Sequence, residues 1–262
     1  MTSVSVVSLQ TRRWGSGDRR ILLLHGLSSS GEGWWRVGPD LAAAGYSVVA
    51  PDLRGHGDSG DGDGFRLTAY RDDVLALGDG WDVALGHSLG GLVVLACQLA
   101  DPGFARSLVL EDPFLRPPAG PETVDWLLTD YAEPITEERM AASRPRWQKE
   151  DVAAKVRALR SAGPHVILGT MDEIGGVDLW PGMADLNVPT LLMGADPAGD
   201  AFVSREDGVA AAANPLVHFE VVPGSSHSIH RDSYDAFRSV LTGFMAAAGL
   251  PGDAAPDPAT GG

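Results

Sequence analysis

Residues 86–90, Gly-His-Ser-Leu-Gly, restrict the fold more than any other part of this sequence. They stand between a short apolar run at 82–85 and a helix-like stretch at 88–100, which is the strand–turn–helix setting that a G-x-S-x-G turn requires. The turn is so sharp that Ser88 must adopt a strained backbone, and glycines two positions before and after it avoid clashes. It holds the hydroxyl above a sheet edge, where the helix N-terminus favours negative charge. The pattern therefore predicts that Ser88 is a nucleophile.

Short apolar runs and helix-like stretches alternate along much of the remaining chain. The runs that we predict as strands are 3–9, 21–24, 47–50, 82–85, 107–110, 190–193 and 217–222. The stretches that we predict as helices are 34–44, 68–77, 88–100, 204–213 and 232–248. Apolar strands that alternate with helices predict an α/β fold on a doubly wound, mostly parallel sheet. Ligands of such sheets bind beyond the carboxyl ends of the strands.

Residues 112–187 interrupt this alternation. They are rich in proline and charge, and their helix-like pieces are 122–131, 137–142 and 151–162. We predict that 113–187 form a helical cap inserted after the sixth strand, and that 1–112 and 188–250 form the core. The end of the chain, 251–262, is rich in Pro, Gly, Ala and Asp and is predicted to be a disordered tail.

Charge excludes several classes of partner. The 262 residues include 35 acidic and 20 basic side chains, which gives a formal net charge of -15. Such a surface repels nucleic acid and anionic membranes. No apolar run reaches the roughly 18 residues of a membrane span, and the start resembles no signal peptide, so a cytoplasmic protein is expected. The single cysteine, Cys97, excludes an intrachain disulfide and is expected to be a buried thiol.

Four motifs together resemble the α/β-hydrolase superfamily. They are Leu-His-Gly-Leu at 24–27, Asp-Leu-Arg-Gly-His-Gly-Asp-Ser at 52–59, the turn at 86–91, and Gly-Ser-Ser-His-Ser-Ile-His at 224–230. They occur in the order and at the spacing of that family, and the resemblance covers nearly the whole chain outside the cap and tail. The resemblance implies a serine hydrolase of the esterase or lactonase type, with a Ser-His-acid triad and no metal or cofactor.

A serine hydroxyl is a weak nucleophile until a base accepts its proton. We predict that His227 is this base, because it follows the last predicted strand and lies after the serine, as the chain order of such triads requires. His230 is the alternative. The resemblance places the oxyanion hole at the backbone amides of Leu27 and Leu89.

The sequence leaves two possible positions for the acid of the triad, each directly after a strand. Most members of the resembling family carry it after the seventh strand, and a minority, including haloalkane dehalogenases and some lactonases, carry it after the sixth. Asp112 lies 24 positions after Ser88, a spacing that resembles the minority, and we predict Asp112. The alternatives are Asp196, which comes one residue early for the usual pattern, Asp200, which comes late, and Glu111. A turn cap before a proline is the structural alternative for Asp112.

Three other histidines, His25, His56 and His87, are expected to support loops through hydrogen bonds. The loop at 52–59 is interpreted as structural and not as a metal site. The cap tryptophans, Trp126, Trp147 and Trp180, and the pair Trp34 and Trp35 would either line an apolar pocket or pack the cap against the core.

The expected substrate is a small molecule, a largely apolar ester or lactone of medium size, cleaved through an acyl-enzyme. Epoxide hydrolases and haloalkane dehalogenases are excluded because they use Asp where this chain has Ser88. Thioesterases, carbon–carbon bond hydrolases and cofactor-free haloperoxidases share the triad and stay open, as does a hydrolase-like ligand sensor with little turnover. No motif indicates the natural substrate or the oligomeric state.

Overall fold

Seven strands form one sheet in a computed structural model of the protein, which describes residues 5–117 and 120–251. The strands are β1 (Thr11–Trp14), β2 (Arg19–Leu24), β3 (Tyr46–Pro51), β4 (Val83–His87), β5 (Leu108–Glu111), β6 (Thr190–Gly194) and β7 (Val217–Val221). They lie in the order β1-β3-β2-β4-β5-β6-β7. β1 is antiparallel to β3, and the other five pairings are parallel.

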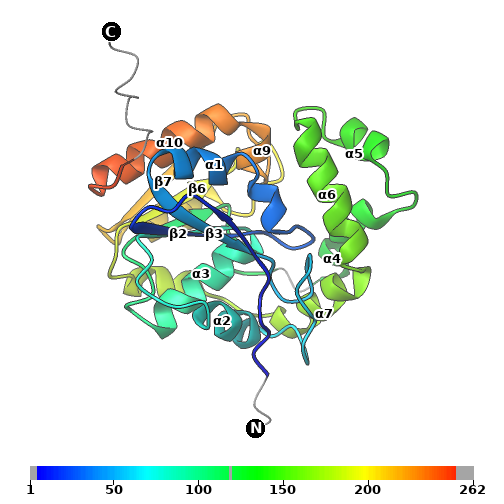
Figure 1. The fold of residues 1–262 in the computed structure, drawn as a ribbon, viewed down its shortest axis with the longest axis horizontal. Coiled ribbons are helices and arrows are strands. Elements are labelled where there is room, and N and C mark those ends of the chain that lie inside the picture. Colours follow the sequence, from blue (N-terminus) through cyan, green and yellow to red (C-terminus); the bar gives the residue numbers. More distant parts are fainter. Residues whose placement is uncertain (1–4, 118–119, 252–262) are drawn as a thin grey trace.

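Helices cover both faces of this sheet (Figure 1). They are α1 (Val37–Ala43), α2 (Leu67–Leu75), α3 (Leu89–Ala100), α8 (Arg205–Ala211), α9 (Ile229–Asp232) and α10 (Tyr234–Ala247), with a short 3-10 helix, η1 (Gly31–Trp34). In Figure 1, α1, α9 and α10 lie on one side of the sheet, and α2 and α3 lie on the other. The expected α/β fold with a doubly wound, mostly parallel sheet is confirmed.

Alternation of side chains along the strands produces two apolar layers. In β2, Leu22 and Leu24 belong to the cluster that includes α3, whereas Ile21 and Leu23 belong to the cluster that includes α1 and α10. All four side chains are buried, as expected for a strand covered on both faces. Cys97 is buried in α3, as predicted.

The register of the central strands brings their carboxyl ends to one line. Leu24 pairs with Gly86, His87 pairs with Glu111, and Glu111 pairs with Met193. The residues that follow these ends therefore meet at the same edge of the sheet, where ligands of doubly wound folds bind.

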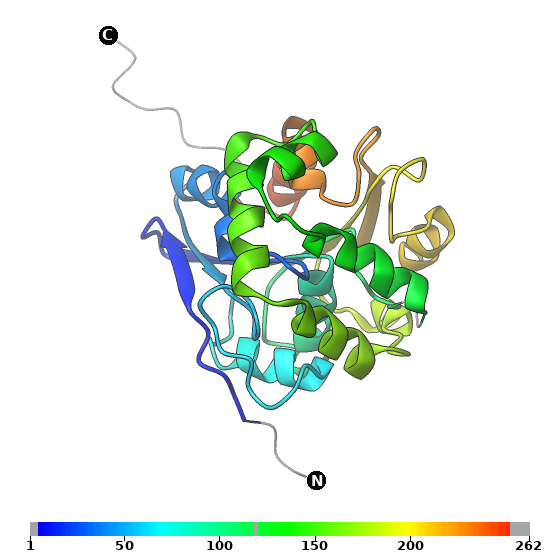
Figure 2. The same cartoon turned by 90° about the vertical axis from the view of Figure 1, so that its right-hand side faces the viewer.

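A helical segment between β5 and β6 lies over this edge (Figure 2). It contains α4 (Pro121–Leu128), η2 (Thr129–Tyr131), α5 (Glu137–Ser143), α6 (Lys149–Ser161), α7 (Pro164–Ile174) and η3 (Trp180–Asp185). The three helical pieces predicted there match α4 with η2, α5 and α6, whereas α7 and η3 were not predicted. Met140, Val152, Val156 and Leu159 form a small apolar cluster within the segment.

The predicted N-terminal strand at 3–9 is wrong over residues 5–9, which form no strand; residues 3 and 4 lie outside the described part of the chain. Side chains bind the backbone of this segment instead. The N–H of Val7 donates to Asp73 Oδ1 (2.7 Å), and the N–H of Ser5 donates to Asp63 Oδ2 (3.3 Å). These donors are therefore not available for a strand ladder.

The helical segment was expected after the sixth strand, but it follows β5, the fifth of the seven described strands. The predicted tail at 251–262 lies outside the described residues except for Pro251, whose carbonyl accepts a hydrogen bond from the Tyr46 hydroxyl (2.8 Å). Within residues 5–117 and 120–251, none of the helices has the length and apolar character needed to cross a membrane.

Candidate active site

Ser88 occupies a strained turn between β4 and α3. Its φ of 54° lies in the left-handed region that non-glycine residues rarely adopt. A Cβ added at Gly86 would lie 2.3 Å from the carbonyl oxygen of Gly90, and one added at Gly90 would lie 2.3 Å from that of Leu24. Only glycine fits at either position, which is the reason for the small residues on both sides of the serine.

His227 lies in the loop after β7, and its imidazole is held by Asp112, directly after β5. Its Nδ1–H donates to Asp112 Oδ2 at 2.6 Å. The Asp112 carboxylate is fully buried and accepts further backbone N–H groups from Phe202 (3.0 Å), Val203 (3.0 Å) and Ala195 (3.4 Å). Since Nδ1 carries the proton, Nε2 of His227 is the nitrogen that can accept one.

The other three candidate acids have different partners. Glu111 accepts from Nδ1 of His230 (2.8 and 2.9 Å) and from the backbone N–H of the same residue (2.8 Å). Asp200 accepts the backbone N–H of His227 (2.8 Å). Asp196 accepts the backbone N–H groups of Gly224 (2.6 Å) and Ala198 (2.9 Å).

 Among the described residues, the structure therefore brings Asp112, and none of these three, onto the imidazole of His227.

Two buried histidines shape the loop that follows β2. His25 Nε2 accepts the N–H of Leu53 (3.0 Å), and its Nδ1–H donates to the carbonyl of Gly26 (2.8 Å). His56 Nε2 accepts the N–H of Ser28 (3.1 Å). Burial lowers the pKa of His25 to about 4 and that of His56 to about 3, so both rings are neutral and can act as acceptors. Both histidines support the loop, as expected.

This loop and α3 supply the two amides that the sequence predicts for the oxyanion hole. Leu89 is the first residue of α3, directly after Ser88, and Leu27 lies in the loop between His25 and Ser28. In the described part of the chain, neither N–H has a hydrogen-bond acceptor. Both residues line or adjoin the pocket above Ser88, so their amides are available to a ligand there.

His87 supports the loop of His227. Its Nε2–H donates to the carbonyl of His227 (3.0 Å), and the centroids of the two rings lie 4.6 Å apart. Burial holds the pKa of His87 well below its usual range, which keeps this ring neutral. The alternative base, His230, is buried and paired with Glu111. Its ring stacks on that of Trp34, with the ring centroids 4.5 Å apart.

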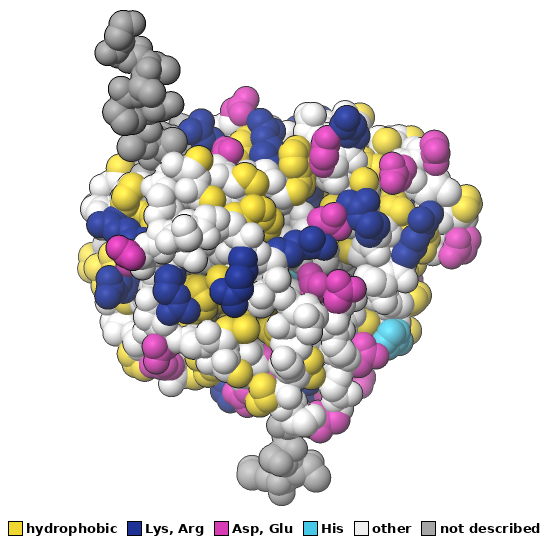
Figure 3. Space-filling view, in the orientation of Figure 1, with side chains coloured by type: hydrophobic (Ala, Val, Ile, Leu, Met, Phe, Trp, Pro, Cys, Tyr) yellow, Lys and Arg dark blue, Asp and Glu magenta, His cyan; other side chains and the backbone are white. Residues whose placement is uncertain are grey.

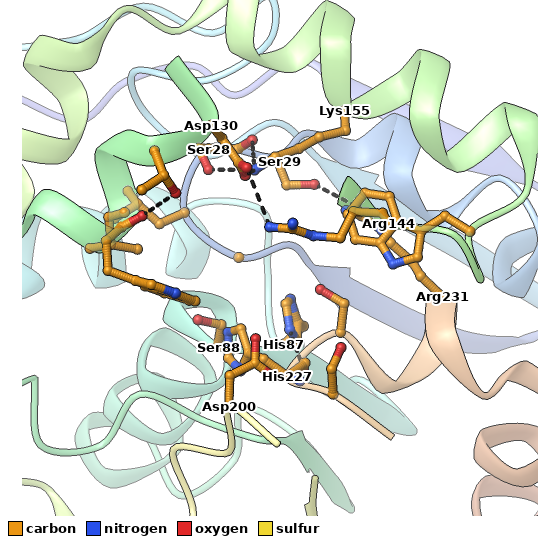
Figure 4. A pocket seen from close by; sticks show the side chains of 18 residues that line it. Ser28, Ser29, His87, Ser88, Asp130, Arg144, Lys155, Asp200, His227 and Arg231 are labelled. Atoms are coloured by element: carbon orange, nitrogen blue, oxygen red, sulfur yellow. Dashed lines mark hydrogen bonds and ion pairs between the residues drawn. The ribbon is translucent and has the colours of Figure 1, made fainter. Parts of the chain in front are cut away.

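A pocket of about 80 Å³ lies above Ser88 and His227 and is lined in part by the helical segment (Figure 4). Of the five tryptophans considered above, Trp126 and Trp147 line it. Trp35 packs the segment against the core instead, because its Nε1–H donates to Asp151 Oδ1 on α6 (2.8 Å). The tryptophans therefore divide between the two roles that the sequence left open.

Charged side chains also line this pocket. Three are cations, Arg144, Lys155 and Arg231, and two are carboxylates, Asp130 and Asp200. Basic and acidic side chains are interspersed on the outer face shown in Figure 3, and the whole chain is acidic, so an excess of cations in the pocket is a local feature.

Sequence reasoning did not single out these cations. Arg144 and Lys155 belong to the inserted segment and stand in no motif. Arg231 directly follows the motif at 224–230, and this position next to a predicted site is the signal that could have found it.

The loop at 52–59 is closed by its own hydrogen bonds. Asp52 Oδ1 accepts the N–H of Gly31 (2.7 Å), and Oδ2 accepts the N–H of Asp58 (3.0 Å). Over residues 5–117 and 120–251, no cluster of three or more His, Cys, Asp or Glu side chains is placed to hold a metal ion. The interpretation of this loop as structural agrees with these contacts.

Comparisons with known proteins agree on one family. A family model described as "Alpha/beta hydrolase family" matches residues 21–240. Lipase LipV of Mycobacterium tuberculosis is 34% identical over 155 residues, which span 56% of this chain and 58% of the lipase. The putative carbamate hydrolase RutD of Azorhizobium caulinodans is 27% identical over 241 residues, or 86% of this chain and 90% of that protein.

Solved structures show the same fold. That of E-2-(acetamidomethylene)succinate hydrolase matches with a TM-score of 0.76 at 22% identity, and the match covers 92% of this chain and 96% of that chain. At this identity the likeness concerns the fold and not the substrate.

Proposed function

Since this chain belongs to the alpha/beta hydrolase family, we propose that it is a serine hydrolase that cleaves a carboxylic ester or lactone through an acyl-enzyme. One observation carries the proposal. The imidazole of His227, held by the buried Asp112 at 2.6 Å, lines the same pocket as Ser88 on its strained turn. Relatives named as a lipase and as a carbamate hydrolase support a hydrolytic reaction.

The first half of the proposed reaction transfers the acyl group to the protein. Ser88 Oγ attacks the carbonyl carbon while its proton moves to Nε2 of His227. The carbonyl oxygen becomes an oxyanion that the N–H groups of Leu27 and Leu89 stabilise. The bond to the leaving alcohol then breaks, and the alkoxide takes the proton from His227, which leaves an ester on Ser88.

The second half uses water in place of the alcohol. His227 accepts a proton from the water molecule, whose oxygen attacks the acyl carbon. The bond to Ser88 breaks, and His227 returns the proton to Oγ. The balance is one ester and one water consumed, with one acid and one alcohol formed. Asp112 stabilises the positive imidazole in both halves.

The test is hydrolysis of p-nitrophenyl esters and of lactones by wild type and Ser88→Ala. We expect kcat/KM to fall by about a thousandfold or more in the variant, because the nucleophile is lost. Circular dichroism checks that the variant is folded. Labelling with a fluorophosphonate should occur in wild type and not in Ser88→Ala, whereas full activity of the folded variant would exclude Ser88 as the nucleophile.

A further inference from the structure

The charged side chains that line the pocket, which we call its charged wall, have no role in the proposed reaction. A buried cation loses its hydration, and this cost must be offset by a partner. Three cations face the pocket, and the two carboxylates that line it are Asp130 and Asp200. The contacts of each cation therefore decide whether the charge is already compensated within the protein.

Lys155 is compensated. Its ammonium group on α6 donates to Ser28 Oγ (2.7 Å) and to the Ser28 carbonyl (3.1 Å), and it lies 3.1 Å from Asp130 Oδ2. An ammonium group has three N–H donors, and these three acceptors use all of them. Lys155 therefore joins the inserted segment to the loop after β2 and has no donor left for a substrate.

Arg231 is not compensated in this way. The residue is only 7% exposed, yet among the described residues no carboxylate lies within ion-pair distance of its guanidinium. Nη2 donates to Ser29 Oγ (2.9 Å), while Nε is buried without a hydrogen-bond partner. A guanidinium has five N–H donors, so most of its capacity is unused.

The carboxylates around Arg231 are occupied elsewhere. Asp151 accepts from Trp35 Nε1 (2.8 Å), and Glu111 accepts from His230 (2.8 Å). Asp232 accepts from Trp147 Nε1 (2.9 Å). They act on Arg231 through space and help it to stay charged, but none of them contacts it.

Arg144 is a second guanidinium on the same wall. It lies 3.3 Å from Asp130 Oδ1, and its side chain is one-third exposed. The indole of Trp147 lies 5.6 Å from the Arg144 guanidinium carbon and 4.7 Å from that of Arg231, so the ring adjoins both cations. In Figure 4, Arg144 and Arg231 lie on the wall across the pocket from Ser88 and His227. Both residues line the same pocket, so an anion bound there would be attracted by both guanidinium groups.

We infer that the pocket takes a small ester or lactone that carries a free carboxylate, and that Arg231 and Arg144 bind this carboxylate while the scissile carbonyl lies at Ser88. The inference rests on the proposed function and refines its substrate class. Guanidinium groups match a carboxylate in charge and in planar geometry. A cavity of about 80 Å³ suits a short carbon chain between the two groups. The charged wall thus replaces the expectation of a largely apolar substrate.

The test compares monomethyl succinate with dimethyl succinate, in which a second methyl group converts the free carboxylate into an uncharged ester. For wild type, we expect kcat/KM to be higher for the monoester by about tenfold or more, since charge-assisted hydrogen bonds form only with the free carboxylate. This preference should fall toward unity in Arg231→Gln and decrease in Arg144→Gln. The control is Arg160→Gln, which removes the same charge from the exposed face of α6 and should keep the preference.

Binding of a carboxylate is measured separately from turnover, with succinate as the probe. Succinate should raise the midpoint of thermal unfolding of wild type and of Ser88→Ala, and raise it less for Arg231→Gln. Arg144→Gln is the second variant for this readout, because its partly exposed site tolerates the change if Arg231→Gln does not fold.

The outcomes separate the two proposals. Ser88-dependent hydrolysis of p-nitrophenyl acetate without a preference for the monoester, and without stabilisation by succinate, overturns the carboxylate site alone. Stabilisation by succinate that depends on Arg231, without any Ser88-dependent hydrolysis, supports the site and counts against the proposed reaction. An equal loss of preference in Arg160→Gln would assign the effect to overall charge and overturn the role of Arg231.

Discussion

Three residues other than glycine have a positive φ in the part of the chain that the structure describes, namely Ser28 (57°), Ser88 (54°) and Asp112 (37°). All three belong to the candidate active site, on the loop after β2, the turn after β4 and the end of β5. Such conformations are unfavourable for residues with a side chain and persist where the surroundings impose them. Their concentration at one sheet edge is consistent with a site that is held in place before a substrate binds.

Asp112 carries the clearest prediction for a single residue. We expect Asp112→Asn to lower kcat by about a hundredfold or more, because the amide cannot stabilise a positive imidazole at His227 as a carboxylate does. The measurement is hydrolysis of a p-nitrophenyl ester, with circular dichroism as the check on folding.

The matched controls are Glu111→Gln and Asp200→Asn. Glu111 accepts a hydrogen bond from the His230 ring, and Asp200 accepts one from the backbone N–H of His227 and not from its ring. Both changes should therefore lower activity less than Asp112→Asn does. A larger loss in either control than in Asp112→Asn would move the role of the acid to that residue.

The sequence predicted the individual site residues unevenly, for a physical reason. The turn at Ser88 is local, so a strand, two glycines and a helix within a few residues suffice to predict it. The acid is not local, because Asp112 and His227 lie 115 positions apart and meet only when β5 and β7 are in register with β6 between them. Spacing could favour Asp112 over Asp200, but only the folded sheet shows which carboxylate reaches the ring.

At the scale of elements, α6 connects the inserted segment to the loop that follows β2. Three of its side chains bind the stretch from Ser28 to Trp35: Asp151 accepts from Trp35, Lys155 donates to Ser28, and Arg157 makes two hydrogen bonds to Glu32 (2.8 and 2.9 Å). This stretch begins directly after Leu27, whose amide we assign to the oxyanion hole. The helix that covers the pocket therefore also positions a part of the proposed chemistry.

Lys155→Met tests this connection. We expect kcat/KM for a p-nitrophenyl ester to fall by about ten- to a hundredfold, because the loop at Ser28 loses two hydrogen bonds and the amide of Leu27 is less well placed. Lys149→Met, on the exposed start of the same helix, removes an equal charge and is expected to leave activity unchanged. Wild-type activity in a folded Lys155→Met variant would show that α6 does not position the loop.

Elements were easier to predict in the sheet than outside it. Six apolar runs match β2 to β7 within two residues at either end, since strands buried on both faces have a clear apolar pattern in the sequence. β1 has no such pattern, because Arg12 and Arg13 lie at its centre. The more apolar run before it, at 3–9, was predicted as a strand, but the backbone N–H of Val7 donates to the Asp73 side chain instead of to a neighbouring strand. In the inserted segment, Pro164 at the start of α7 is a helix signal that went unused.

At the scale of the whole molecule, buried neutral histidines make stability depend on pH. Burial is the main cause that lowers the pKa of His25 to about 4 and of His56 to about 3, and it also lowers that of His87. An unfolded chain exposes these rings, so it binds protons near pH 6.5 that the folded chain does not bind. The free energy of unfolding should therefore be highest above pH 6.5 and fall as the pH drops toward 4.

Urea unfolding at pH 7 and pH 5 measures this effect. We expect the free energy of unfolding to be lower at pH 5 by about 1 to 2 kcal/mol for each of His25 and His56, before most carboxylates take up protons. His56→Gln should show a smaller difference between the two pH values than wild type, whereas His218→Gln, at the surface, should show the same difference. A free energy that is constant from pH 7 to pH 5 would mean that the buried rings are not excluded from protonation.

The pocket cations show what the sequence could not predict at this scale. Arg144, Lys155 and Arg231 come from α5, α6 and α9 or their ends, and no spacing rule connects them. Their excess over the carboxylates is visible only when the pocket is assembled from both the core and the inserted segment.

The inserted segment leaves the sheet after β5 and returns at β6, and these two strands are direct neighbours. Its two ends are therefore fixed by the sheet and not by its own length or composition. Substitutions at 120–187 can alter the charges that face a ligand without disturbing the strand register that aligns Ser88, Asp112 and His227. For an evolving lineage, and equally for a protein engineer, this stretch is the natural unit to exchange when a new substrate is wanted from the same bond-breaking machinery.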